Sequence, residues 1–356
     1  MKKKILYVTE SFGGGVFSYL VGLSNMLSDD YDICIAYSLR PQTPQNFRDY
    51  FDSKVTLVKV KNFTRNINPL KDARAIGEIR HIAKEFKPDI IHLHSSKAGV
   101  LGRIAFNFSK EKLYYTPHGY SFLMQDASKI KRFVYWGIEK VIGFSRSTTI
   151  SCSEGEFKES QKLTNNNELV NNGVDIDELQ KLRSNFQCDD GENISIFTIG
   201  RISKQKNPDL FNEIAKKFPK IKFIWIGDGN LRSELTSKNI EVTGWLQRNE
   251  AIKLAMKSNF FILTSLWEGL PISLLESMFL GKECFVSNVI GNKDVIEDGV
   301  NGFICSDLSD FENKIKNLIL NRKMGEKIAE SARLDILKKY NTKVMASEYK
   351  KIYSSK

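Results

Sequence analysis

Short apolar segments alternate with longer amphipathic segments along this chain, and this alternation constrains the fold more than any other feature of the sequence. In the first half we predict strands at residues 5–9, 33–37, 55–60, 90–94, 113–116 and 148–151. A second series follows at residues 194–199, 222–226, 240–242, 260–263, 284–287 and 302–305. Helical segments such as 16–27 and 72–86 lie between the strands. Strands that alternate with helices are typical of parallel α/β sheets, so the sequence predicts two Rossmann-like domains in tandem.

The length of the chain agrees with two domains. At 356 residues and 41% apolar content, it exceeds the size at which a single core stops growing, roughly 250 to 300 residues. Residues 173–193 are polar and rich in turn formers, so we place a linker there between a domain at 1–172 and a domain at 194–340. We expect residues 341–356 to end the chain as a helix, centred on 342–353.

One segment carries two carboxylates eight residues apart, Glu268 and Glu276, in the run SLWEGLPISLLESM. Pro271 suits the first position of a helix, and the apolar residues after it continue the helix. The free N–H groups near Ile272 and Ser273 could then bind a phosphate, while the two glutamates accept hydroxyl groups on either side. A sugar nucleotide is the matching ligand. Two solvated glutamates on a surface loop and helix are the simpler interpretation of the spacing alone.

A cation pair follows the strand expected at 194–199. Gly200 is succeeded by Arg201 and, five residues later, by Lys206. A planar guanidinium and a point charge on one loop suit a diphosphate, because the first binds it in a fork and the second neutralises a leaving group. Basic residues on a loop are more often simply solvated.

A glycine loop follows the first expected strand. Gly13, Gly14 and Gly15 carry no side chains, so the backbone could approach a diphosphate at a helix start. Gly13, Gly15 and Ser18 have the spacing of the dinucleotide fingerprint G-x-G-x-x-G/A, but one residue does not match, because Ser18 stands in the last position. The acidic residue expected after the second strand is also missing, which disfavours an NAD(P)-dependent oxidoreductase.

Histidines lie at or just after the ends of two of the expected strands. His118 follows the strand at 113–116 and is a candidate to donate a hydrogen bond to a sugar hydroxyl. His92 and His94 alternate in the strand at 90–94, and we expect them to face opposite sides of the sheet. His94 is nearer the strand end and could help to shape a site, but a structural role for both is the simpler interpretation.

These segments together resemble the family 4 (group 1) retaining glycosyltransferases. Residues 268–278 fill the family's donor motif, E-G-[FL]-[GP]-x3-[LI]-E-[AS]-[ML], and residues 200–207 fill its signature G-R-[LI]-x3-K-[GN]. The resemblance extends over nearly the whole chain. It implies the GT-B architecture, in which two doubly wound domains face each other across a cleft and the last helix crosses back onto the first domain.

The resemblance also implies roles for individual residues. Those implied to be catalytic are His118 and Glu268 at the donor sugar and Arg201 and Lys206 at the diphosphate. Those implied to bind the donor are Gly14, Gly15, Gly200, Leu246, Gly269, Leu270, Pro271, Ile272, Ser273 and Glu276. Glu276 is expected to hold the ribose hydroxyls, and the backbone at Leu246 is expected to read the base.

The implied reaction moves a sugar, with retention, from a nucleotide-diphosphate donor to a polyprenyl-diphosphate-linked saccharide in capsule or O-antigen synthesis. Uridine is the default base. We expect no cofactor and no metal, because the Asp-x-Asp triplets at 30–32 and 175–177 lie before a strand and in the linker. A GT-B protein that binds its ligand without turnover is the main alternative.

The charge distribution points to an anionic partner. Residues 1–170 carry 25 Lys and Arg against 17 Asp and Glu, and the remainder carries 28 against 25. The lysines are scattered without a recognised motif, which argues against nucleic acid. Residues 129–146 mix aromatics, aliphatics and cations at helical spacing, which fits either a lipid interface or a core-facing helix with snorkelling lysines.

The remaining features favour a cytoplasmic protein on the inner face of the membrane. Five scattered cysteines without a C-x-x-C pair are typical of a reducing compartment. The apolar run after the N-terminal lysines is too short for a signal peptide, and we find no stretch of 18 apolar residues. We therefore expect peripheral rather than integral membrane contact.

Overall fold

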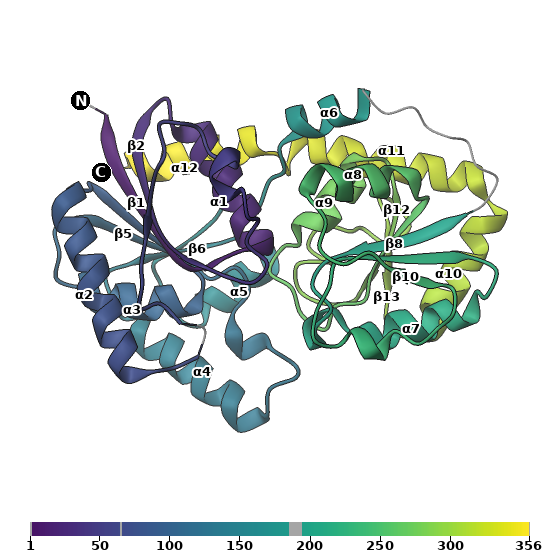
Figure 1. The fold of residues 1–356 in the computed structure, drawn as a ribbon, viewed down its shortest axis with the longest axis horizontal. Helices are drawn as coiled ribbons and strands as arrows, with labels where there is room; N and C mark the ends of the chain where they lie inside the picture. The colour runs from purple at the N-terminus through teal and green to yellow at the C-terminus, as the bar shows by residue number, and fades with distance from the viewer. Residues whose placement is uncertain (1, 65, 185–193, 356) are drawn as a thin grey trace. The chain divides into compact units, whose positions relative to one another are not determined.

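The computed structural model describes residues 2–64, 66–184 and 194–355 (Figure 1). The chain divides into two compact units. Unit 1 comprises residues 1–172 and 342–356, and unit 2 comprises residues 173–341. Each unit is built on one parallel sheet with helices on both faces.

Unit 1 contains a seven-stranded sheet in the order β3-β2-β1-β4-β5-β6-β7, with every neighbouring pair parallel. Its strands are β1 (Lys3–Phe12), β2 (Tyr31–Leu39), β3 (Thr56–Lys59), β4 (Ile90–His94), β5 (Lys112–Thr116), β6 (Thr148–Ser151) and β7 (Asn167–Leu169). Its helices are α1 (Gly14–Leu27), α2 (Pro69–Phe86), α3 (Ser96–Phe106), α4 (Lys129–Ile142), α5 (Glu154–Gln161) and α12 (Thr342–Ser354).

Two apolar cores cover the two faces of this sheet. On one face, Ile5 and Tyr7 of β1 pack in a cluster with residues of α1 and α12. On the other face, Leu6 and Val8 pack with residues of α2 and α3. Successive side chains of a strand point to opposite faces, so a strand buried on both faces must be continuously apolar. Residues 5–8 of β1, which are Ile, Leu, Tyr and Val, meet this requirement.

The last helix, α12, belongs to unit 1 although it follows all of unit 2 in the chain (Figure 1). Tyr349 and Tyr353 are fully buried. The Tyr349 hydroxyl lies 2.5 Å from the hydroxyl of Tyr19 on α1, and the Tyr353 hydroxyl lies 2.6 Å from His92 Nδ1 on β4. The end of the chain is therefore part of the first unit's core.

Unit 2 contains a six-stranded parallel sheet in the order β10-β9-β8-β11-β12-β13. Its strands are β8 (Ser195–Ile199), β9 (Lys222–Ile226), β10 (Ile240–Val242), β11 (Phe260–Leu263), β12 (Glu283–Ser287) and β13 (Phe303–Cys305). Its helices are α6 (Ile176–Ser184), α7 (Pro208–Lys217), α8 (Arg248–Lys257), α9 (Ile272–Phe279), α10 (Leu308–Leu320) and α11 (Arg322–Lys338). Short 3-10 helices lie at Lys204–Lys206 and Arg232–Glu234 in this unit, and at Phe47–Tyr50 and Ser121–Leu123 in unit 1.

The strand order places one switch point in each sheet. The order of strands reverses between β1 and β4 in unit 1, and between β8 and β11 in unit 2. Ligands of doubly wound sheets bind outside the carboxyl ends of the strands at such points. The loops after these four strands are therefore where each unit should carry its chemistry.

The predicted strands are confirmed, two other expectations need correction, and one short strand was not predicted. Residues 173–193 are not a simple linker, because α6 forms within them and belongs to unit 2; residues 185–193 lie outside the described residues. The amphipathic helix expected at 129–146 ends at Ile142, where Gly143 caps it. The short strand β7 was not predicted, because its sequence, NEL, has too little apolar content to signal a strand.

Candidate functional site

Two loops at the switch point of unit 2 are tied together by an ion pair. Lys206 Nζ lies 2.6 Å from Glu268 Oε1, and Ser265 Oγ donates to the same oxygen at 2.6 Å. Gln205 Nε2 donates to the carbonyl of Trp267 at 3.0 Å. The side chains of Lys206 and Glu268 are only 16% and 8% exposed. The loop after β8 therefore holds its ammonium directly beside the carboxylate that follows β11.

Glycine is required at position 200 for this arrangement. Gly200 has a φ of +153°, and a Cβ atom there would lie 3.1 Å from Lys206 Cε. The Trp225 side chain donates its N–H to the Gly200 carbonyl at 2.8 Å, which holds the backbone in place. Arg201 follows directly and is half-buried. Arg201 and Lys206, the side chains predicted to contact a diphosphate, thus share the loop after β8.

Helix α9 begins at Ile272, one residue later than predicted. Pro271 is its N-cap residue, and its extended ψ of 120° places it just before the helical backbone. The Pro271 side chain does not cap the first turn. The N–H of Leu274 donates to the Pro271 carbonyl at 3.1 Å, so the N–H groups of Ile272 and Ser273 are those left without an intrahelical acceptor. Gly269 and Leu270 are buried, and Ser273 is half-buried. The helix start therefore retains the donors that a phosphate would use.

The second carboxylate of the motif has a cationic partner that sequence reasoning missed. Glu276 is 5% exposed, and Arg248, the first residue of α8, donates from Nη1 to its Oε1. Arg248 Nε lies 3.2 Å from Glu178 Oε2 on α6. One guanidinium therefore links two carboxylates from two other helices. Nothing in the local sequence pairs residues 28 positions apart.

The residue expected to read a base lies close to this cluster in the chain. Leu246 sits between β10 and α8, two residues before Arg248. It is 37% exposed, and its neighbour Trp245 is 51% exposed. Gly244 has a φ of +73° and turns the backbone out of β10. The candidate base reader thus lies two residues before Arg248 in the chain, and the candidate ribose binder, Glu276, accepts a hydrogen bond from Arg248.

In unit 1, the glycine loop after β1 is shorter than expected, because β1 extends to Phe12. Gly13 is the N-cap of α1, and Gly14 and Gly15 already form its first turn. Gly14 has a φ of +57°, which favours a residue without a side chain. A Cβ at Gly13 would meet the side chain of Gln42 at 2.7 Å. These glycines therefore permit an abrupt start of α1 at the switch point.

His118 lies in a turn after β5 with a φ of +55°, in the left-handed region that few residues other than glycine adopt. The following N–H, of Gly119, donates to Glu156 Oε1 at 2.6 Å, and the N–H of Cys152 donates to Oε2 at 2.8 Å. The buried Glu156 thereby fixes the turn, and sequence reasoning did not identify it. A strained turn held by buried hydrogen bonds is a common feature of functional sites.

The expectation that His92 and His94 face opposite sides of the sheet is wrong. Residues two apart in a strand share a face, and the ring centroids of these two lie 4.1 Å apart. His94 Nδ1 lies 3.1 Å from His118 Nε2, and Tyr19 packs edge-on against His118 at 4.6 Å. His94 therefore contacts the predicted site residue directly.

All three histidines are held neutral by burial. Burial lowers the pKa of His118 to about 3. Burial, and secondarily the neighbouring histidines, lowers the pKa values of His92 and His94 well below the ordinary value. A neutral imidazole can donate one hydrogen bond and accept another. His118 is thus suited to hydrogen bonding rather than to carrying a charge.

The two Asp-x-Asp triplets have other partners. Asp30 pairs with Lys350 at 2.5 Å. Asp175 Oδ1 accepts from the N–H groups of Asp177 and Glu178 at the start of α6. Among residues 2–64, 66–184 and 194–355, no group of three or more His, Cys, Asp or Glu side chains is placed to hold a metal ion.

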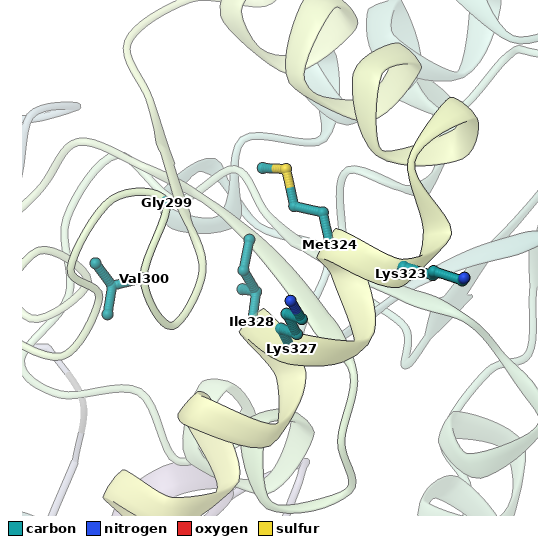
Figure 2. A pocket seen from close by; sticks show the side chains of 6 residues that line it. All are labelled: Gly299, Val300, Lys323, Met324, Lys327 and Ile328. Atoms are coloured by element: carbon teal, nitrogen blue, oxygen red, sulfur yellow. The ribbon is translucent and has the colours of Figure 1, made fainter.

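A pocket of about 400 Å³ lies elsewhere in unit 2, between the loop at Gly299 and Val300 and the first turns of α11. Figure 2 shows Met324 and Ile328 of α11 on one side of it and the loop on the other. Lys323 and Lys327 complete the lining. None of the predicted site residues lines this pocket.

Two doubly wound parallel sheets, with glycine and charged loops at their switch points, define a protein of the GT-B class. The family model described as "Glycosyltransferase Family 4" matches residues 13–178. The model described as "Glycosyl transferases group 1" matches residues 180–335. The two matches together cover most of the chain, which therefore belongs to the group 1, family 4 glycosyltransferases.

Two bacterial relatives match most of the chain. An Escherichia coli "UDP-Gal:alpha-D-GlcNAc-diphosphoundecaprenol alpha-1,3-galactosyltransferase" is 28% identical over 338 residues, which cover 86% of this chain and 85% of that protein. A Klebsiella pneumoniae "Uncharacterized 41.2 kDa protein in cps region" is 28% identical over 373 residues, with 99% of both chains covered.

Solved structures agree on the fold. The sucrose-phosphate synthase of Thermosynechococcus elongatus superposes with a TM-score of 0.83 at 14% identity, covering 99% of this chain and 98% of that one. Anabaena HepE, solved in complex with UDP and glucose, gives 0.78 at 18% identity, covering 99% and 100%. At these identities the likeness concerns the GT-B fold.

The neutral histidines predict how the stability of the protein depends on pH. Their pKa values are lower in the folded state than the ordinary 6.5, so the unfolded chain binds more protons below that pH. The free energy of unfolding should be undiminished above about pH 6.5 and should fall on acidification, by up to about 1.4 kcal/mol per pH unit for each histidine. Urea unfolding at pH 7 and pH 5 measures this loss.

The variant His94→Phe should lose less stability between pH 7 and pH 5 than the wild type, because one proton uptake is removed. His81→Phe, at an exposed position on α2, controls for the loss of a histidine as such. An equal loss in wild type and His94→Phe would show that His94 is not held neutral in the fold.

Proposed function

We propose that this protein transfers a sugar from a UDP-sugar to a lipid-linked saccharide, with retention of configuration and without a metal ion, in the synthesis of a surface polysaccharide. The observation that carries the proposal is the contact between Lys206 and Glu268 at the switch point of unit 2. It joins a cation suited to a diphosphate and an acceptor suited to sugar hydroxyls, at the place where this class of fold binds ligands.

The choice of donor rests on the relatives. The name of the E. coli relative gives UDP-galactose as its donor, and Anabaena HepE was solved with UDP and glucose. In this chain, we assign the ribose hydroxyls to Glu276 and the base to the backbone at Leu246. The first turn of α9, at Ile272 and Ser273, would donate its N–H groups to the diphosphate.

In the proposed reaction, the bond between the sugar C1 and the diphosphate oxygen breaks, and its electron pair remains on UDP. The acceptor hydroxyl oxygen bonds to C1 on the same face, and its proton passes to the departing phosphate oxygen. Arg201 and Lys206 stabilise the charge that develops on the diphosphate. Glu268 orients the sugar ring, and the neutral His118 donates a hydrogen bond to a sugar hydroxyl.

The acceptor is assigned by the same relatives. The E. coli protein's name gives a GlcNAc-diphosphoundecaprenol acceptor. The K. pneumoniae relative is described from a cps region, and a Staphylococcus aureus relative at 23% identity is named a capsular polysaccharide biosynthesis glycosyltransferase. A polyprenyl-diphosphate acceptor is embedded in the membrane, so an enzyme that uses it must work at the membrane surface.

Helix α4 is the surface that we assign to this contact. Its exposed residues Ile130, Phe133, Val134 and Val141, followed by Phe144, recur at helical spacing, and Ile130, Phe133 and Phe144 are 78%, 71% and 81% exposed. An outward apolar stripe of this kind is expected of a helix that lies in a lipid interface.

The opposite side of α4 is anchored in unit 1. Glu139 is the one fully buried residue of the helix, and its carboxylate accepts from Arg103 Nη2 at 2.7 Å and from the Tyr115 hydroxyl at 2.9 Å. Tyr135 and Trp136 pack against the core. The described residues contain no helix that is long and apolar enough to span a membrane. We therefore propose peripheral attachment on the cytoplasmic face.

A thermal-shift panel of UDP, GDP, ADP, NAD and NADP, with EDTA and then with magnesium, tests the donor site. UDP should raise the stability without metal, by about 2.7 kcal/mol at 100 times its dissociation constant. The variant Glu276→Ala should lose this shift, because the ribose loses its acceptor. Glu213→Ala, which removes an exposed glutamate of α7, should keep it.

Other outcomes of this panel would contradict the proposal. A shift with NAD or NADP alone would return the glycine loop to a dinucleotide-binding role. A shift with UDP that depends on magnesium would contradict metal independence. Binding of UDP without turnover of any UDP-sugar, with lipid-linked acceptor supplied, would favour a non-catalytic binding protein.

Sedimentation with lipid vesicles tests the membrane contact. Vesicles that contain an anionic lipid should carry wild-type protein down with them, and Ile130→Ser with Phe133→Ser should weaken binding by at least about 10-fold for each side chain, because burying one is worth roughly 1.5 to 3 kcal/mol. Leu320→Ser, at a position of unit 2 that is 82% exposed, is the matched control. Equal sedimentation of the α4 variant and wild type would refute the assignment.

A further inference from the structure

The guanidinium of Arg248 occupies an unusual place, between a buried carboxylate of the proposed donor site and a carboxylate outside it. Its Nη1 donates to Glu276 Oε1, and its Nε lies 3.3 Å and 3.2 Å from the two oxygens of Glu178. Arg248 opens α8, Glu276 lies on α9 and Glu178 lies on α6. Helix α6 also packs on α8 and on α9.

This geometry restricts the Glu276 carboxylate. A glutamate side chain has several rotatable bonds, and a carboxylate offers about four acceptor positions. Arg248 takes one position on Oε1, and it cannot follow Glu276 into another rotamer without leaving Glu178. Arg248 engages Oε1, which leaves the second oxygen, Oε2, to accept from a ligand.

Charge gives a second reason for the arrangement. Glu276 is 5% exposed, and a buried carboxylate without a cation costs several kcal/mol. A nucleoside diphosphate would bring further negative charge to the same region. The guanidinium of Arg248 offsets the negative charge of Glu276, and so reduces its repulsion of an anionic ligand.

We propose that Arg248 is a positioning residue that makes the donor site selective for a ribose with free hydroxyls. It does so by holding the Glu276 carboxylate in one orientation, with Glu178 as its second anchor. Arg248 itself need not touch the nucleotide. The inference rests on the proposed function, because it takes the ribose hydroxyls as the ligand of Glu276.

The test compares UDP with 2′,3′-dideoxyuridine diphosphate, which lacks both ribose hydroxyls, by calorimetry on the full-length protein. A hydrogen bond to a charged group contributes about 1.5 to 3 kcal/mol, so wild type should bind UDP about 10- to 100-fold more tightly than the dideoxy analogue. Arg248→Met should reduce this ratio to about 3-fold or less, mostly by weakening UDP. Glu276→Ala should reduce the ratio equally.

Arg322→Met is the matched control. Arg322 pairs with Glu283, whose side chain is 6% exposed, at 3.4 Å on another part of unit 2. This variant also leaves a buried glutamate without its arginine, so it reproduces any general loss of stability. It should keep the wild-type ratio. Arg248→Gln is measured in parallel, in case Arg248→Met folds poorly. It keeps a hydrogen-bonding group without the charge, and it should also reduce the ratio.

The outcomes separate the inference from the proposed function. If wild type binds UDP and the dideoxy analogue equally, or binds neither, the ribose role of Glu276 fails and the inference fails with it. If wild type and Arg322→Met discriminate, Glu276→Ala does not, and both Arg248 variants still discriminate, the inference alone is overturned. A shared loss of discrimination in Arg322→Met would show a general structural effect and would also overturn it.

Discussion

The ion pair between Lys206 and Glu268 is the interaction on which the candidate donor site depends. It connects the loops after β8 and β11, the two strands that flank the switch point of unit 2. Gly200, with a φ of +153°, lets the backbone turn into the loop that carries Lys206, and Ser265 shares the same carboxylate oxygen. A change in any of these residues would move a charge that the proposed chemistry uses.

The same rule of paired charges explains the second carboxylate. A site that accepts sugar and ribose hydroxyls needs acceptors, yet unpaired carboxylates would repel a diphosphate by about 4 kcal/mol per pair at close range. In unit 2 each glutamate of the motif has its own cation, Lys206 for Glu268 and Arg248 for Glu276. Acceptors for hydroxyl groups are thereby retained without an excess of negative charge.

The fold could be predicted because its signals are local. Buried parallel strands must be apolar on both faces, so segments such as 222–226 and 260–263 were located without error. The motif around Glu268 and Glu276 was equally visible, because loop, helix start and second carboxylate lie within one run. Contacts between distant segments carry no such signal: Tyr19 and Tyr349 are 330 residues apart, and Arg248 could be recognised only when α8 and α9 were in place.

The proposed reaction is a retaining, metal-independent transfer from a UDP-sugar. To test it, the enzyme is supplied with a panel of α-configured UDP-sugars and GlcNAc-diphosphoundecaprenol in the presence of EDTA, and the anomeric configuration of the product is determined by NMR. We expect an α-linked product at a rate that added magnesium does not change. A β-linked product, or transfer only after a metal is restored, would contradict it.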